Sequence, residues 1–291
     1  MRLPRSAVLR SLAMMAPARI ELLTFDCTGT LFEPAIPLGV LYKQAVVAQA
    51  LDDAKLVAAA EALSEIELTS AFGKAYAAAD RARPCFGAGV CDSEEWWRPV
   101  VDETILTAAA QSFEESDLLE GLLPGIFDRL YPTFATRDAW QLTPHALETL
   151  ETLRGWADGP KLGVISNWDE RLHTVLEQLE VADRFAFVLT SREFGEEKPD
   201  ARIFERAREL AGVGAGSRSV HVGDSFKRDI VGARQSGDGW QAVFVCSEAE
   251  RRRVSAVELQ AIEHTHLESL ATLVDVLKGD SLVTERDRKQ Q

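Results

Sequence analysis

Residues 20–31 read IELLTFDCTGTL, an apolar run that ends at Asp26 and is followed by a turn containing Gly29. Four further apolar runs occur at 162–165, 187–189, 220–222 and 242–245. Continuous apolar runs of this length are typical of strands buried on both faces. Helical periodicity lies between the later runs, for example over 171–179 and 201–211. Strands that alternate with helices predict an α/β fold with a doubly wound parallel sheet.

The long segment 34–140 between the first two strands has helical periodicity and almost no strand signal. It is expected to form an inserted domain with about four helices, over 40–51, 54–79, 94–110 and 116–130, broken at the loop 83–91. A further helical stretch is expected after Cys246, to about residue 277. The predicted division is a leader or transit peptide at 1–19, a core at 20–33 and 141–278, a helical cap at 34–140, and a charged tail at 279–291.

The composition is that of a folded globular protein, with 46% hydrophobic and 27% charged residues among 291. A formal net charge of −14 repels nucleic acid and anionic lipid, and no basic run offers a local exception. The four cysteines form no Cys-x-x-Cys pair, so we expect reduced thiols and no structural zinc. Neither nucleic acid nor a membrane is therefore expected as a partner, and the oligomeric state is left open.

Residues 1–20 contain four arginines and no acidic residue. This composition suits an organelle transit peptide, which would place the protein in a mitochondrion or plastid. The alternative is a short disordered leader on a cytoplasmic protein, with Met14 or Met15 as the true start. No apolar run approaches the roughly 18 residues needed to span a bilayer.

Polar residues follow the predicted strands at the point where each ends. They are Asp26 to Leu31 after the first strand, Ser166 and Asn167 after the second, Lys198-Pro199-Asp200 after the third, and Asp224, Ser225 and Asp229 after the fourth. Ligands of open α/β sheets bind at the carboxyl ends of the strands. The four segments are therefore expected to converge on one site.

Three carboxylates of this set suit a magnesium ion. A carboxylate attacks phosphorus only if a cation neutralises the repulsion between two anions. Asp26, Asp224 and Asp229 supply the hard oxygen ligands that Mg²⁺ prefers. An aspartate after a strand can also be only a helix N-cap or a turn former, and this alternative would suffice for Asp200 and for Asp229.

Other conspicuous residues receive structural interpretations. Asp169 and Arg171 are expected to be a helix start and a solvated charge. Trp96 and Trp97 are expected to pack within the cap or to contact the core. Cys27 is expected to be a small buried residue, with a redox-sensitive thiol as the alternative.

The four segments, in this order, resemble the motifs of the haloacid dehalogenase superfamily, whose nucleophilic aspartate stands at the end of the first strand. Trp96-Trp97-Arg98, SNWDERL at 166–172 and KPDARIF at 198–204 look like one branch of its subfamily IA. The resemblance covers roughly residues 20–246. It implies a Rossmann-like core with an α-helical cap inserted after the first motif.

The resemblance also implies a role for each residue. Asp26 would be the nucleophile, and the backbone carbonyl of Thr28 would complete a Mg²⁺ shell with Asp26, Asp224 and Asp229, the last either directly or through water. Lys198 would offset the charge of phosphate and nucleophile. Ser166 and Asn167 would hold phosphate oxygens, and Gly29 and Thr30 would shape the loop beneath them. The expected substrate is a small phosphorylated molecule.

Thr28 departs from the family pattern. Phosphatases of the superfamily usually carry a second aspartate there as the general acid and base, and losing such a group costs roughly 10²–10⁴ in rate. Asp-x-Thr-Gly-Thr resembles instead the phosphorylation loop of P-type ATPases, whose phosphoenzyme hydrolyses slowly. Dehalogenation is disfavoured, because haloacid dehalogenases dispense with Mg²⁺.

Three functions therefore stay open. The first is a Mg²⁺-dependent phosphohydrolase of low or specialised activity, acting through an aspartyl phosphate on Asp26. The second is a non-catalytic regulatory protein that binds phosphate and metal. The third is a phosphotransferase that protects the aspartyl phosphate for another acceptor.

Overall fold

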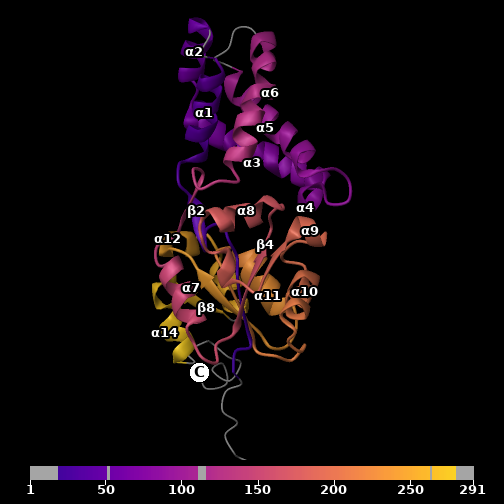
Figure 1. Ribbon diagram of the computed structural model, residues 1–291, viewed down its shortest axis with the longest axis vertical. Helices are drawn as coiled ribbons and strands as arrows, with labels where there is room; N and C mark the ends of the chain where they lie inside the picture. The colour runs from indigo at the N-terminus through magenta and orange to yellow at the C-terminus, as the bar shows by residue number, and fades with distance from the viewer. Residues whose placement is uncertain (1–18, 51–52, 111–115, 263, 280–291) are drawn as a thin grey trace, which may run out of the picture.

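The computed structural model describes residues 19–50, 53–110, 116–262 and 264–279. Except for Arg19 and Gly279, the predicted leader and charged tail lie outside the described residues. Figure 1 shows two bodies stacked along the long axis, with helices α1 to α6 forming one and a sheet with its helices forming the other.

Six parallel strands form the main sheet, in the order β5-β4-β1-β6-β7-β8. They are β1 (Leu22–Phe25), β4 (Lys161–Ser166), β5 (Phe187–Thr190), β6 (Ser219–Gly223), β7 (Trp240–Val245) and β8 (Thr265–Leu267). From β1 the chain builds outward through β4 and β5, then returns to the other side of β1 for β6. The crevice at the end of β1 is thus a topological switch point, where such sheets bind ligands. The predicted doubly wound, Rossmann-like sheet is confirmed.

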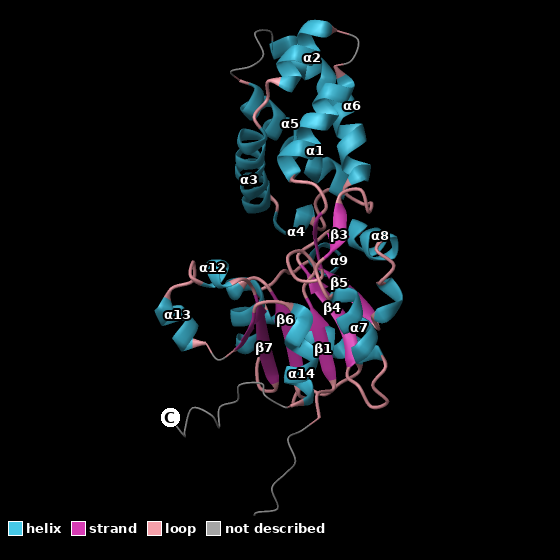
Figure 2. Cartoon of the chain, turned by 90° about the vertical axis from the view of Figure 1, so that its left-hand side faces the viewer, coloured by secondary structure: helices cyan, strands magenta, loops and turns pink. Residues whose placement is uncertain are grey.

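Helices cover both faces of the sheet because successive strand residues point to opposite sides. Leu23 and Phe25 pack into one apolar cluster, and Leu22 packs into another. The first cluster involves α7 (Ala146–Arg154), α8 (Arg171–Gln178), η1 (Ala182–Arg184), η3 (Leu270–Thr272) and α14 (Leu273–Lys278). The second involves α9 (Ser191–Phe194), α10 (Ala201–Ala211), η2 (Phe226–Val231), α11 (Gly232–Gln235) and α13 (Ala256–Ala261). Figure 2 shows the strands of this sheet side by side beneath the helical insert.

The insert is helical, as predicted. Its helices are α1 (Leu38–Gln49), α2 (Ala54–Glu61), α3 (Glu65–Ala82), α4 (Pro84–Gly87), α5 (Ser93–Ala109) and α6 (Ser116–Thr133). The single helix expected over 54–79 is wrong, because Ser64 begins a new helix by accepting a hydrogen bond from the Glu67 N–H at 3.3 Å. The predicted break at 83–91 coincides with α4, where Cys85 and Phe86 have positive φ angles.

Two short strands join the insert to the core. β2 (Phe32–Pro34) and β3 (Trp140–Leu142) pair in antiparallel fashion, with Phe32 opposite Leu142. Neither strand was predicted, because three-residue strands carry little periodicity. The chain thus leaves and re-enters the core along one hydrogen-bonded stem. The bounds of the cap, 34–140, stay a prediction.

The continuous helical stretch expected after Cys246 is wrong. α12 (Glu248–Arg251) and α13 are followed by β8, which extends the sheet beyond β7. The Cys246 N–H donates to the Leu267 carbonyl at 3.0 Å, so backbone pairing with β7 overrides local helical preference.

Two expectations from composition can be compared with the structure. All four cysteines are free thiols. Among the helices that the structure describes, none combines the length and the apolar character needed to cross a bilayer.

Candidate active site

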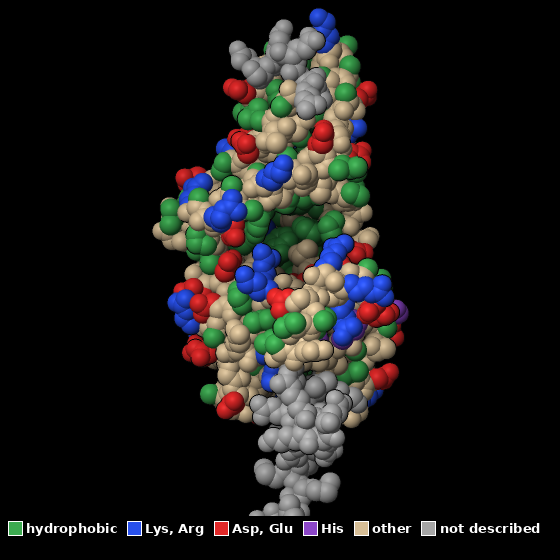
Figure 3. Space-filling view, turned by 180° about the vertical axis from the view of Figure 1, so that it is seen from behind, with side chains coloured by type: hydrophobic (Ala, Val, Ile, Leu, Met, Phe, Trp, Pro, Cys, Tyr) green, Lys and Arg blue, Asp and Glu red, His purple; other side chains and the backbone are tan. Residues whose placement is uncertain are grey.

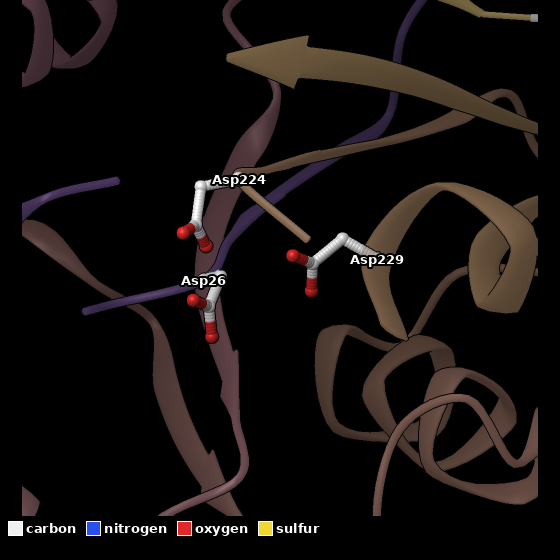
Figure 4. A group of neighbouring side chains, drawn as sticks. All are labelled: Asp26, Asp224 and Asp229. Carbon is white, nitrogen blue, oxygen red and sulfur yellow. The ribbon is translucent and has the colours of Figure 1, made fainter. Parts of the chain in front are cut away.

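Asp26 lies directly after β1, at the switch point of the sheet, and is only 8% exposed. Figure 4 shows the carboxylates of Asp224, which follows β6, and of Asp229 in η2 turned toward Asp26. One carboxylate oxygen from each residue lies within 4.8 Å of the other two. The fold therefore brings together three carboxylates that are up to 203 positions apart in the sequence, from 26 to 229.

Lys198 joins two of these carboxylates. Its Nζ lies 2.6 Å from Asp26 Oδ1 and 2.6 Å from Asp229 Oδ1, and the residue is only 1% exposed. Burial by itself would lower the pKa of Lys198, but the carboxylates of Asp229 and Asp26 raise it above its usual value. The side chain is thus a buried ammonium ion paired with the predicted nucleophile.

Asp229 is held from several sides. Its Oδ1 also lies 3.2 Å from His221 Nε2, and its Oδ2 accepts the Ser225 N–H at 2.8 Å. Burial would raise the pKa of Asp229, but Lys198 and His221 hold it well below its usual range. Burial lowers the pKa of His221, so neutral His221 donates through Nε2, and its Nδ1 accepts from the Thr24 hydroxyl at 2.8 Å.

The sequence analysis missed Thr24 and His221. Both are polar residues inside otherwise apolar strands, and each is completely buried. A buried polar residue needs a hydrogen-bonding partner, so the interruption of two apolar runs was the signal that could have found them.

Asp224 has the most exposed side chain of the three aspartates. The surrounding protein still shields its carboxylate from water. This desolvation, together with the negative charges of Asp26 and Asp229, raises the pKa of Asp224 to about 8. Gly29, at a φ of +83°, lets the loop approach it, because a Cβ there would lie 2.3 Å from Asp224 Oδ2. Three crowded carboxylates repel one another when all are ionised, and a divalent cation would relieve this repulsion. Their oxygen atoms are also the ligands that Mg²⁺ prefers, so these residues fit a Mg²⁺ ion.

Ser166 and Asn167 lie beside Asp26 at the end of β4. The Ser166 hydroxyl donates to Asp26 Oδ1 at 2.9 Å. The Asn167 amide grips the backbone of Lys198, donating to its carbonyl at 3.0 Å and accepting from its N–H at 2.9 Å. Since an amide has two N–H donors, one is still available to a ligand. The Thr30 hydroxyl is buried and has no partner within the described residues.

Thr28 lies two residues after Asp26. Its Oγ1 accepts a hydrogen bond from Trp168 Nε1 at 2.9 Å. Both residues border a cavity of about 480 Å³ that the aspartates, Lys198 and Ser166 also line. No role was predicted for Trp168, because an isolated tryptophan carries no spacing signal.

Asp169 is not the simple helix start that was expected, and Arg171 is not a solvated charge. Asp169 is completely buried and accepts from the Arg171 guanidinium at 2.7 Å and from Trp97 Nε1 at 2.6 Å. Trp97 belongs to α5, so this bond links the insert to the core. Trp96 instead packs within the insert and donates to the Arg83 carbonyl at 2.8 Å.

Comparison with known proteins identifies the family. The family model described as haloacid dehalogenase-like hydrolase matches residues 20–237. The chain belongs to this family. The resemblance predicted from the motifs is confirmed, and the match spans the helical insert and the sheet strands β1, β4, β5 and β6.

Known proteins that this chain resembles support the same family assignment. Haloacid dehalogenase-like hydrolase domain-containing protein 3 from Bos taurus is 36% identical over 75% of this chain and 80% of its own. Glyceraldehyde 3-phosphate phosphatase from Methanothermobacter thermautotrophicus is 35% identical over 46% of this chain and 58% of its own. A solved structure described as a dehalogenase with an intermediate complex covers 90% of this chain and 98% of its own, with 19% identity and a TM-score of 0.60. At that identity the likeness concerns the fold alone.

Proposed function

We propose that this protein is a Mg²⁺-dependent phosphohydrolase that acts on a small phosphorylated substrate through an aspartyl phosphate on Asp26. The observation that carries the proposal is the buried Lys198 ammonium, paired with Asp26 beside two further carboxylates. A phosphate entering this cavity would meet a nucleophile and a fixed positive charge together. The relative named as a phosphatase of glyceraldehyde 3-phosphate supports the same class of reaction.

The metal would be held by Asp26, Asp224 and the backbone carbonyl of Thr28. Mg²⁺ would neutralise the charge between the carboxylate and the phosphate. Asp229 would act through water, because Lys198, His221 and the Ser225 N–H already occupy its oxygens. Mg²⁺ usually keeps several waters in protein sites, which suits this arrangement.

The phosphate would be held by groups around Asp26. Lys198 would offset its charge, and the Ser166 hydroxyl and the remaining Asn167 N–H would bind its oxygens. Gly29 and Thr30 would shape the loop beneath it. Arg228, which the sequence analysis did not single out, also lines the cavity and adds positive charge at its wall.

Catalysis would proceed in two displacements. Asp26 Oδ2, which accepts no side-chain hydrogen bond from the described residues, would form a bond to phosphorus while the ester bond breaks and the leaving oxygen takes the electron pair. Water would then attack phosphorus, break the acyl phosphate bond and regenerate Asp26, its proton passing to phosphate or solvent. Thr28 cannot supply or accept these protons near neutral pH. Esters with good leaving groups would therefore react best.

The same threonine favours a second candidate. An aspartyl phosphate without a neighbouring base hydrolyses slowly, which would leave time for transfer to another acceptor. A phosphotransferase would pass the phosphoryl group of the adduct to another acceptor, whereas a hydrolase would pass it to water. A non-catalytic binding protein would form no adduct.

A metal-dependent screen of phosphorylated metabolites, with Asp26→Asn as the blank, tests the proposal. We expect Mg²⁺-dependent phosphate release that Asp26→Asn abolishes. Intact mass after an acid quench should detect a phosphorylated chain only in the wild type. Release that persists in Asp26→Asn would reject the nucleophile, and a wild type without release or adduct would leave only the binding protein.

A further inference from the structure

A second cavity adjoins the phosphoryl site. It has a volume of about 290 Å³ and lies between the insert and the core. Figure 3 shows a deep hollow between these two bodies, with hydrophobic side chains gathered inside it. The mechanism proposed above uses none of its apolar wall.

Most of the residues that line the wall are aromatic. The insert contributes Tyr42, Phe72, Tyr76, Phe86, Trp97, Tyr131 and Phe134, and the stem and core add Trp140 and Trp168. Phe72 and Trp97 stack, with an interplanar angle of 13° and centroids 6.3 Å apart. Aromatic pairs gain stability beyond the effect of buried area, so an aromatic ligand group packs favourably against such a wall.

The wall offers no uncompensated charge from the described residues. Its one charged side chain, Arg171, is paired with Asp169 at 2.7 Å. The guanidinium also lies over the rings of Tyr131 and Trp97, 4.1 and 5.1 Å from their centroids. A ligand portion with its own carboxylate or phosphate would be desolvated here without a free partner, so the cavity favours a neutral group.

The cavity adjoins the phosphoryl site and shares part of its wall. The residues Thr28, Phe72, Tyr76, Asn167 and Trp168 line both. A ligand whose phosphate lies at Asp26 would therefore extend its other end past Thr28 into the aromatic cavity. The volume is about twice the ~150 Å³ that accepts benzene in an apolar cavity, so two fused rings fit.

We propose that this cavity binds the leaving group of the substrate, and that the substrate class is a monophosphate ester of a neutral aromatic alcohol or phenol of about two fused rings. This inference rests on the proposed function, since it places the phosphate at Asp26. For a phenol ester it also agrees with Thr28, because a phenolate departs without a general acid at that position. Asp26 oxygen bonds to phosphorus as the aryl oxygen leaves with its electron pair.

A pair of non-hydrolysable phosphonates tests binding separately from turnover. Naphthalen-1-ylmethylphosphonate and methylphosphonate share the phosphonate and differ in the rings. In the presence of Mg²⁺, calorimetry on the wild type should give a dissociation constant about 30-fold lower for the naphthyl compound, the effect of burying an aromatic group. Equal affinities, or no binding of the naphthyl compound at millimolar concentration, would overturn the inference.

A matched pair of variants locates the effect. Val101 is 3% exposed and lines the cavity, whereas Val90 is 74% exposed on the insert. Val101→Phe should reduce the 30-fold preference to about threefold or less by filling the cavity, and Val90→Phe should keep it. A preference that survives in folded Val101→Phe would place the rings elsewhere. If Val101→Phe does not fold, the phosphonate pair on the wild type decides alone.

The two proposals can fail separately. A naphthyl preference in binding, without hydrolysis of any ester, would reject the proposed function and keep the aromatic site. If the protein hydrolyses acetyl phosphate but does not prefer 1-naphthyl phosphate over a phosphate ester without rings, the proposed function stands and the aromatic site is rejected.

Discussion

Trp168 Nε1 donates to Thr28 Oγ1 at 2.9 Å, at the boundary between the polar and the aromatic cavity. The bond orients the hydroxyl that stands where phosphatases of the superfamily usually carry a carboxylic acid. An indole N–H can only donate, so Thr28 accepts from Trp168 and keeps its own proton for another acceptor.

Replacing Thr28 with Asp should raise turnover of an unactivated phosphate ester about 100-fold or more, the usual effect of a positioned acid and base. The adduct on Asp26 should become shorter-lived, because the new carboxylate can deprotonate water. Steady-state assays on a sugar phosphate and on p-nitrophenyl phosphate measure this, with the larger gain expected for the sugar ester.

Thr28→Asn is the matched control, since its amide has the shape of Asp without the titratable proton. An equal gain in Thr28→Asn and Thr28→Asp would show that shape matters rather than proton transfer. Rapid wild-type hydrolysis of a sugar phosphate would show that another residue supplies the proton.

Asp224→Asn should weaken Mg²⁺ binding at least about tenfold, the usual effect of even an outer-shell change at a metal site. The substitution removes the negative charge of one metal ligand. A bound cation would therefore relieve less repulsion among residues 26, 224 and 229 than it does in the wild type. Titration calorimetry of the two proteins measures the difference. Asp158→Asn, at a side chain 88% exposed, is the control and should bind Mg²⁺ as the wild type does. Equal affinity in Asp224→Asn would reject the site.

Lys198→Met should lower the free energy of unfolding by about 3 kcal/mol in metal-free protein, because it leaves two buried carboxylates without their shared cation. Added Mg²⁺ should restore part of this loss by binding the folded state. Urea unfolding with and without Mg²⁺ measures both effects. Lys227→Met, at an exposed lysine, controls for loss of charge. A Lys198→Met protein as stable as Lys227→Met would contradict the prediction.

Trp97→Phe should lower the free energy of unfolding by about 1–3 kcal/mol, because buried Asp169 loses one of its hydrogen-bond donors. Since the lost bond joins the insert to the core, hydrogen exchange should also rise along both partners of this contact. Trp96→Phe removes an indole bond that stays inside the insert, to Arg83. Exchange that rises at the contact equally in both variants would mean that the Trp97 bond does not hold the two bodies together.

Asp200→Ala should lower the free energy of unfolding by about 1 kcal/mol at pH 7, because Asp200 is the N-cap of α10 and accepts the Arg202 N–H at 2.9 Å. Hydrogen bonds from Arg202 lower the pKa of Asp200 to about 2. The carboxylate therefore contributes stability above its unfolded-state pKa and loses it as the pH falls toward about 2. The difference between variant and wild type should shrink between pH 4 and the lowest pH at which both fold. If the stability difference between variant and wild type does not change with pH, the shape of the Asp200 side chain and not its charge causes the effect.

The sequence by itself determined five of the six strands of the sheet, all but β8, and the polar residues that gather at their carboxyl ends. Strands such as β1 and β6 are local apolar runs, and the polar residues that follow them must lie at the carboxyl edge of a parallel sheet. Asp26, Asp224 and Lys198 could therefore be named before any coordinates. The N-cap role allowed for Asp200 is equally local, and the structure confirms it. Short elements such as β2, β3 and β8 lacked enough residues to show a period.

Only the tertiary structure decided which side chains meet. Trp168 and Thr28 are 140 positions apart, and Trp97 and Asp169 are 72 apart. Neither pair leaves a spacing pattern, because hydrogen bonds between distant segments depend on how the insert packs against the core. The aromatic cavity has the same origin: its rings come from several helices and a two-stranded stem, and each would be an ordinary core residue if read alone. A local pattern specifies an element, whereas a binding surface between two bodies exists only once both have packed.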